Sequence, residues 1–208
     1  MPPCVLAAHG STDPGYAEIV ARLAVRVAQA LPDVDVRIGF LDHGPPFVRE
    51  VADPGSVVVP LLLAGGFHAR TDLPEQAQGC LITPPIGPDA GLAQVLSDRL
   101  AEAGWNGTQS VLLAAASSTD PQSADDVGRM ARWLGESVGQ AVEVALIDAA
   151  GIPVGERGPE AVATYVLGPG RFASSIMTCG AAVIAAPLGD HPLIAEIIVT
   201  RYGRTAPM

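Results

Sequence analysis

The chain has 208 residues, of which 49% are hydrophobic and 16% charged, and its formal net charge is −10 at pH 7. This composition supplies a sizeable buried core and excludes an intrinsically disordered chain. The acidic balance, the lack of lysine and an aromatic content of only 4% exclude nucleic acid and anionic membrane surfaces as expected partners. They do not exclude a small anionic molecule held by local arginines and backbone N–H groups.

The cysteine pattern and the apolar runs indicate a cytoplasmic protein. Cys4, Cys80 and Cys179 are spaced too widely for a disulfide framework or a paired-cysteine metal site. The N-terminal segment has no basic stretch and its apolar run breaks at His9, so we expect no signal peptide. The longest apolar runs have about ten residues, whereas a membrane-spanning helix needs about 20.

Short apolar runs alternate with amphipathic stretches in the first half of the chain. The pattern predicts strands at 5–8, 34–41, 56–63 and 80–83, and helices at 16–31 and 89–103. Strands that are almost continuously apolar and are separated by helical patterns are typical of parallel sheets buried on both faces.

The same pattern starts again after a turn at 104–108. It predicts strands at 111–115, 142–147, 163–168 and 181–185, and helices at 124–138 and 192–202. Four blocks also repeat in order: VLAAHGSTDP (5–14) with LLAAASSTDP (112–121), FLDHGPPF (40–47) with LIDAAGIP (146–153), PLLLAGGFHA (60–69) with VLGPGRFA (166–173), and PIGPDAGLAQVL (85–96) with PLGDHPLIAEII (187–198). Matched blocks at nearly constant offsets indicate a duplication.

We therefore predict an α/β protein built from two tandem, doubly wound parallel-sheet half-domains related by a pseudo-two-fold axis. The boundary is expected near 105, giving an N-terminal half at 1–105 and a degenerate copy at 106–208. Ligands of such sheets bind beyond the carboxyl ends of the strands. We expect the site in the cleft between the halves, with the second half as its opposite wall.

Three polar side chains follow predicted strands of the first half. His9 follows the first, Asp42 the second, and His68 lies in the glycine-rich loop after the third. Two imidazoles and a carboxylate suit Zn²⁺, Co²⁺, Ni²⁺ or Fe²⁺, although a histidine after a strand also commonly serves only as an orienting hydrogen-bonding group. The second half has Ala116 and Phe172 at the two histidine positions, so we expect one competent site per chain.

Several other polar residues have structural interpretations. His43 is expected to point away from Asp42 on an extended chain, and His191 lies at a helix start that Asp190 is expected to cap. The segment 11–13 can cap the first helix or offer N–H groups to an anion. The glycine pair at 65–66 indicates close backbone approach to a bulky ligand. No phosphate-binding loop, dinucleotide fingerprint or serine nucleophile elbow is present.

Taken together, the HGS turn, the PLLLAGGFHARTDLP loop and the PPIGP and PLGDHPLIAE elements resemble the class II tetrapyrrole chelatases. Among these the chain is most similar to the sirohydrochlorin chelatases in their two-half, single-chain form. The resemblance implies that His9 and His68 bind the metal and that Asp42, where the family usually has Glu, assists proton removal. Thr12 stands where the family commonly has Arg, which removes a contact to substrate carboxylates.

The resemblance implies insertion of Co²⁺, Fe²⁺ or Ni²⁺ into sirohydrochlorin or a similar tetrapyrrole, with the metal as substrate and no organic cofactor. The expected substrate-binding residues are Ser11, Gly65, Gly66, Phe67, Arg70 and Arg171. The alternatives are a non-catalytic carrier of metal or tetrapyrrole, and an enzyme of other chemistry on the same scaffold. A monomer and a homodimer are both compatible with a duplicated chain.

Overall fold

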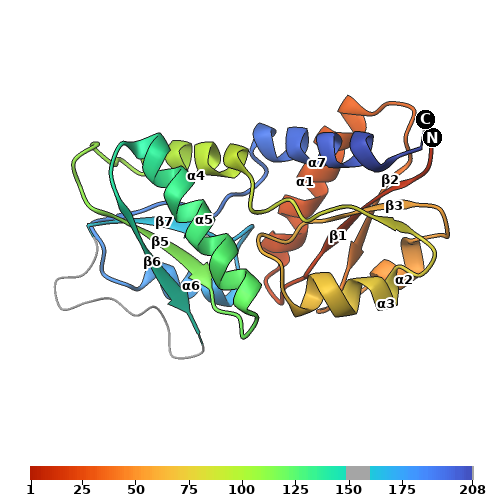
Figure 1. The fold of residues 1–208 in the computed structure, drawn as a ribbon, viewed down its shortest axis with the longest axis horizontal. Coiled ribbons are helices and arrows are strands. Elements are labelled where there is room, and N and C mark those ends of the chain that lie inside the picture. Colours follow the sequence, from red (N-terminus) through yellow and green to blue (C-terminus); the bar gives the residue numbers. More distant parts are fainter. Residues whose placement is uncertain (149–159, 208) are drawn as a thin grey trace. The chain divides into compact units, whose positions relative to one another are not determined.

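A computed structural model describes residues 1–148 and 160–207 and contains, within them, two four-stranded parallel sheets (Figure 1). The strand orders are β2-β1-β3-β4 and β6-β5-β7-β8, so the second sheet repeats the topology of the first. Every strand pair is parallel. The predicted fold class and the repeated order of elements are therefore confirmed.

The elements form two compact units. The first contains β1 (Cys4–Ala8), α1 (Pro14–Ala30), β2 (Val36–Phe40), α2 (Val48–Val51), β3 (Val57–Pro60), the π-helix η1 (His68–Asp72), α3 (Leu73–Gln76), β4 (Leu81–Ile82) and α7 (Pro192–Thr205). The second contains α4 (Ala90–Glu102), β5 (Val111–Ala116), α5 (Pro121–Val138), β6 (Val142–Ile147), β7 (Ala161–Tyr165), α6 (Arg171–Met177) and β8 (Val183–Ile184).

These compact units are composed differently from the two halves of the sequence. The first unit spans Met1–Gly87 and Asp190–Met208, and the second spans Pro88–Gly189. The helix that ends each repeat therefore packs with the other sheet: α7 lies against α1 and β3, and α4 against α5 and β7. Side chains on both helices form hydrogen bonds within these units. In the first unit the Tyr202 hydroxyl of α7 donates to the Pro2 carbonyl at 2.7 Å, and in the second Arg99 Nη2 of α4 donates to the Leu188 carbonyl at 3.0 Å.

Each sheet is covered by helices on both faces. In the first unit α1 and α7 lie on one face and α2 and α3 on the other (Figure 1). Val5 and Ala7 of β1 point into the layer under α2 and α3, together with Val58, Val48 and Leu73. The whole of β1 is buried, as expected of a central parallel strand. None of the described helices is long and apolar enough to cross a membrane.

The repeated STDP motif starts the first long helix of each unit in the same way. Asp13 accepts a hydrogen bond from the Gly15 N–H and Asp120 from the Gln122 N–H, each at 2.9 Å. The backbone angles of the two caps agree closely, with φ −82° and ψ 120° at Asp13 and φ −83° and ψ 121° at Asp120. A proline follows each cap and suits the first helical turn. The predicted cap of α1 is thereby confirmed.

Four short helices were not predicted from the sequence: α2, η1, α3 and α6. They have four to seven residues, which is too short for a helical period to stand out. The repeat block at 146–153 lies largely outside the described residues.

Candidate metal centre

The carboxyl ends of β1 and β2 are held together by backbone hydrogen bonds, and this places His9. The residue directly follows β1, and its carbonyl accepts from the Asp42 N–H at 2.9 Å. Gly10, with φ +97°, turns the chain there, and a Cβ at this position would lie 2.2 Å from the Asp42 carbonyl oxygen. A glycine is therefore required where the loops after β1 and β2 meet.

His68 is the first residue of η1, in the loop after β3, the other neighbour of β1 in the sheet. Its imidazole meets that of His9 edge to face, with ring centroids 4.4 Å apart and an interplanar angle of 85°. The two Nε2 atoms are 3.2 Å apart. The structure thus brings together the two histidines that the sequence placed at strand ends 59 residues apart.

The other ring nitrogen of each histidine faces an oxygen atom. Nδ1 of His9 lies 3.1 Å from the Gly10 carbonyl, and Nδ1 of His68 lies 2.5 Å from Oδ2 of Asp72. A carbonyl or carboxylate oxygen only accepts hydrogen bonds, so both Nδ1 atoms carry the proton. In the neutral rings both Nε2 atoms then present lone pairs.

Two lone pairs that face each other across 3.2 Å repel unless a cation lies between them. Two nitrogen ligands bound about 2.0–2.1 Å from one metal ion at a tetrahedral angle lie about 3.3 Å apart. The observed separation therefore suits adjacent ligands of a single divalent ion.

The surroundings of His9 favour its neutral form. Desolvation by burial lowers the pKa of His9, and the hydrogen bond with the Gly10 backbone opposes this effect. The neighbouring imidazoles His68 and His43 lower the pKa further. Because a metal binds the unprotonated ring nitrogen, a lowered pKa reduces competition from protons near neutral pH.

Tyr16 on α1 is buried behind the His9 turn. Burial raises the pKa of its phenol to about 12, against the opposing effect of hydrogen bonds with the backbone of Gly10 and His9. The phenol therefore stays neutral, and its oxygen is hydrogen-bonded to the backbone of the His9 turn. The sequence placed Tyr16 only at the start of the helix predicted at 16–31, and its contact with the His9 turn was not predicted.

Asp42 follows β2 next to the histidine pair but is turned toward solvent, with its side chain 66% exposed. Its Oδ1 accepts from the His43 N–H at 2.7 Å, and this hydrogen bond is the main cause that lowers the pKa of Asp42. The nearby histidines lower the pKa further. Asp42 is consequently ionised at neutral pH.

His43 lies closer to the site than predicted. The expectation that its side chain points away assumed an extended chain, but His43 has a left-handed backbone with φ 65°. This turn brings the His43 ring to a centroid distance of 5.5 Å from the His9 ring. Within residues 1–148 and 160–207, however, no group of three His, Cys, Asp or Glu side chains is placed to hold a metal ion.

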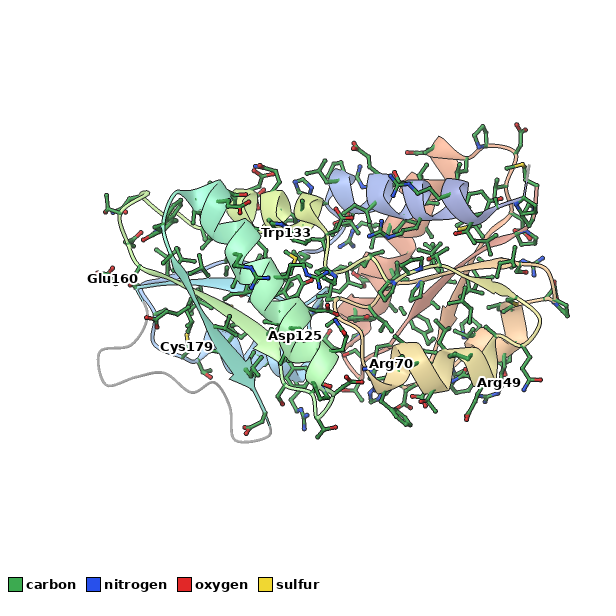
Figure 2. The ribbon with its side chains drawn as sticks, in the orientation of Figure 1. Arg49, Arg70, Asp125, Trp133, Glu160 and Cys179 are labelled. Atoms are coloured by element: carbon green, nitrogen blue, oxygen red, sulfur yellow. The ribbon has the colours of Figure 1, made fainter. Side chains whose placement is uncertain are left out.

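The predicted substrate-binding residues of the first unit lie around the pair. Ser11 accepts from the Asp13 N–H at 3.1 Å and so shapes the turn before α1. Gly65 and Gly66 precede η1; the Phe67 ring is 61% exposed and lies edge-on to the His68 ring, 5.9 Å between centroids. Arg70 lies on η1 with an exposed side chain (Figure 2).

Arg171 belongs to the second unit, where it starts α6 and places its guanidinium 5.1 Å from the centre of the Phe172 ring. Its predicted contact with substrate stays a prediction. His191 is the cap of α7, and its Nδ1 accepts from the Leu193 N–H at 3.3 Å. The expectation that Asp190 caps this helix is wrong, because Asp190 pairs with Arg22 of α1 at 3.1 Å.

Asp72 is the contact that sequence analysis missed. It follows His68 by four residues, a spacing that places two side chains on one side of a helical turn. The signal was present as His-x-x-x-Asp, but the segment was interpreted as a glycine-rich loop. A helical interpretation would have paired the two.

The fold and the family of the chain are identified by comparison with known proteins. SirB from Bacillus subtilis, solved with Fe3+, superposes with a TM-score of 0.78 at 22% identity, over 99% of this chain and 96% of that chain. CbiX, described as the terminal enzyme for biosynthesis of siroheme in denitrifying bacteria, superposes with a TM-score of 0.75 at 23% identity, over 99% of this chain and 100% of that chain. The fold is thus that of the two-half chelatases.

Sequence comparison gives the family. Residues 3–103 match the CbiX family model. The chain is 31% identical to the sirohydrochlorin cobaltochelatase of Methanosarcina acetivorans over 118 residues, which cover 46% of this chain and 91% of that protein. The sirohydrochlorin cobaltochelatase of Sulfurisphaera tokodaii is 28% identical over 118 residues, which cover 51% of this chain and 97% of that protein. The chain belongs to the CbiX family of sirohydrochlorin chelatases.

Proposed function

We propose that this protein inserts a divalent metal ion, Co²⁺, Fe²⁺ or Ni²⁺, into sirohydrochlorin. Membership of the CbiX family supports the reaction and its substrate. The observation that carries the proposal is the His9–His68 pair, whose Nε2 lone pairs converge at 3.2 Å while both Nδ1 atoms are engaged elsewhere. A divalent cation between the rings would remove the repulsion between these lone pairs.

The small number of protein ligands fits the chemistry of insertion. Among the described residues no third His, Cys, Asp or Glu side chain completes a ligand set around the pair. A metal ion bound to His9 and His68 keeps open positions that the pyrrole nitrogens of the substrate can occupy. The ion is a substrate that must leave with the macrocycle, so a fully closed site would oppose the reaction.

Insertion also releases two pyrrole protons, which need an acceptor. We propose that Asp42, which lies on the loop bonded to His9 and is ionised at neutral pH, accepts them one at a time. Its side chain is 66% exposed, so it can pass each proton on to bulk water. Its lowered pKa makes it a weak base, so its contribution is expected at the lower end of the ~10²–10⁴-fold range of general-base assistance. Its negative charge also attracts the incoming cation.

The remaining residues of the first unit are proposed to hold the macrocycle. The exposed Phe67 ring beside His68 offers an apolar surface for the macrocycle face. The Arg70 guanidinium suits bidentate contact with a peripheral carboxylate. Backbone at Ser11, Gly65 and Gly66 can approach the ligand closely. Because the chain carries a net charge of −10, recognition of a polycarboxylate depends on such local contacts.

The test is an insertion assay with Co²⁺ and sirohydrochlorin, followed by the change in visible absorbance against a control without protein. We expect His9→Ala and His68→Ala each to reduce the protein-dependent rate to background. His191→Asn is the matched control: it also removes an imidazole but keeps a side chain that can cap α7, and we expect the wild-type rate.

The assay also decides between the enzyme and the carrier. If the wild type binds Co²⁺ and sirohydrochlorin but does not accelerate insertion over the control, catalysis is refuted and the protein is a carrier. If either His9→Ala or His68→Ala retains the wild-type rate, the metal site is assigned to the wrong residues.

A further inference from the structure

The two imidazoles of the metal centre are held in unequal ways. His9 donates its Nδ1 proton to the neutral carbonyl of Gly10 at 3.1 Å. His68 donates to the Asp72 carboxylate at 2.5 Å. Hydrogen bonds to a charged acceptor are roughly twice as strong as those between neutral groups. The hydrogen bond that orients His68 is therefore the stronger of the two, although the His68 side chain is 44% exposed.

The backbone that carries this contact is a widened helical turn. In η1 the Leu73 N–H bonds to the His68 carbonyl five residues earlier, a π-type bond, before α3 continues the chain. Pro74 follows directly; it has no N–H, and its ring clashes with the carbonyl four residues back in a regular α-helix. The widened turn removes this conflict. Such π-turns commonly occur at functional sites.

The far end of the segment is anchored as well. Leu73 is fully buried against the sheet, and Gln76 of α3 donates to the Leu41 carbonyl at the end of β2, at 3.0 Å. Asp72 therefore projects from a fixed backbone rather than from a loose loop. Its side chain is 27% exposed, so its bond with His68 is partly shielded from water.

From these contacts we infer that Asp72 is the positioning residue of the metal centre. It locks His68 in the Nδ1–H form and orients the ring so that the Nε2 lone pair faces that of His9. Asp72 touches neither metal nor macrocycle and acts only through His68. This inference rests on the proposed metal site. Carboxylates that hold a metal-binding histidine in this way typically change metal affinity by about 10–100-fold.

The first arm of the test uses the metal-free protein and long-range ¹H–¹⁵N NMR of the histidine rings. In the wild type we expect the His68 signals of the Nδ1–H form. In Asp72→Ala we expect a shift toward the Nε2–H form, because the acceptor for the Nδ1 proton is gone. Glu75→Ala is the control: it removes an exposed carboxylate from α3, three residues away, and should leave the His68 signals unchanged.

The second arm measures Co²⁺ affinity by titration of the visible Co²⁺ absorption bands, without sirohydrochlorin. We expect the affinity to fall about 10–100-fold in Asp72→Ala and to stay at the wild-type value in Glu75→Ala. Circular dichroism checks the fold, and Asp72→Leu, which has a similar branched shape but no acceptor for the Nδ1 proton, replaces the alanine variant if that variant unfolds.

The outcomes separate the inference from the proposed function. If the wild type binds Co²⁺ and Asp72→Ala keeps both its affinity and the Nδ1–H signals of His68, the inference is wrong and the metal site stands. If the wild type binds no Co²⁺, the proposed site is wrong. A loss of affinity with unchanged His68 signals would also refute the inference, because it would trace the effect to charge alone.

Discussion

The two units of the molecule share a scaffold but differ at the strand ends. In both, a serine hydroxyl in the STDP turn accepts a hydrogen bond at 3.1 Å from a backbone N–H: Ser11 accepts from Asp13, and Ser118 from Asp120. Both sheets have the same strand order. Yet the second copy has Ala116 in place of His9 and Phe172 in place of His68. The turn that starts the helix is thus retained in both units, whereas the histidines beside it are present only in the first.

The residues that support the histidines are also missing from the second copy. At the repeat offsets, Gly10 corresponds to Ser117 and Asp72 to Ile176. Ile176 is fully buried in the core of its unit and lies in α6, an ordinary α-helix without the proline that follows η1. In the second copy, which lacks the histidines, the position that corresponds to Asp72 therefore contributes to core packing. The comparison can be tested by matched substitutions in the two copies.

The largest expected difference concerns the paired aspartates after the second strand of each sheet. Asp42→Asn should lower the rate of metal insertion about 10²-fold, because it removes the proposed proton acceptor beside His9. Asp148→Asn, the corresponding change in the second copy, should leave the rate unchanged. Initial rates at saturating Co²⁺ measure both. Equal rates in the two variants would remove Asp42 from the mechanism.

A smaller effect is expected where the first loops differ. Gly10→Ser introduces a Cβ at φ +97°, within 2.2 Å of the Asp42 carbonyl, and should lower the free energy of unfolding by about 2 kcal/mol or more. Ser117→Gly should lower the free energy of unfolding by less than about 1 kcal/mol, because Ser117 does not have the positive φ that would favour a glycine. Urea unfolding followed by circular dichroism measures both. Similar losses would show that the close approach at Gly10 is not specific to the copy that carries the histidine pair.

The smallest effect should be equal in both copies. Asp13→Ala and Asp120→Ala each remove a helix cap of the same geometry, so each should reduce the free energy of unfolding by about 1 kcal/mol. Denaturant unfolding measures the two losses. A clearly larger loss for one cap would mean that the scaffold, and not only the site, has diverged.

The sequence was sufficient for most of the fold. Near-continuous apolar strands, long amphipathic helices and the repeated STDP turn predict β1, β5, α1 and α5, because each carries its signal locally. The packing of α4 and α7 carries no such signal. Which sheet a helix covers depends on contacts distant in sequence, so the exchange of the two terminal helices was not predicted.

For the site, the topology was enough to bring His9 and His68 together, since both follow neighbouring parallel strands. The contacts of Asp72 and His43 depend on two backbone departures, a π-turn at η1 and a left-handed residue after Asp42. Neither follows from hydrophobic periodicity. The proline after Leu73 was the only local indication of the first.

The exchange of helices has a consequence for how the chain folds as it is synthesised. The second unit is continuous from Pro88 to Gly189, so all of its parts leave the ribosome together. The first unit lacks α7 until residues 192–205 emerge, and one face of its sheet stays partly uncovered until then. The second unit can therefore complete its packing before the first unit, which carries the His9–His68 pair and requires α7.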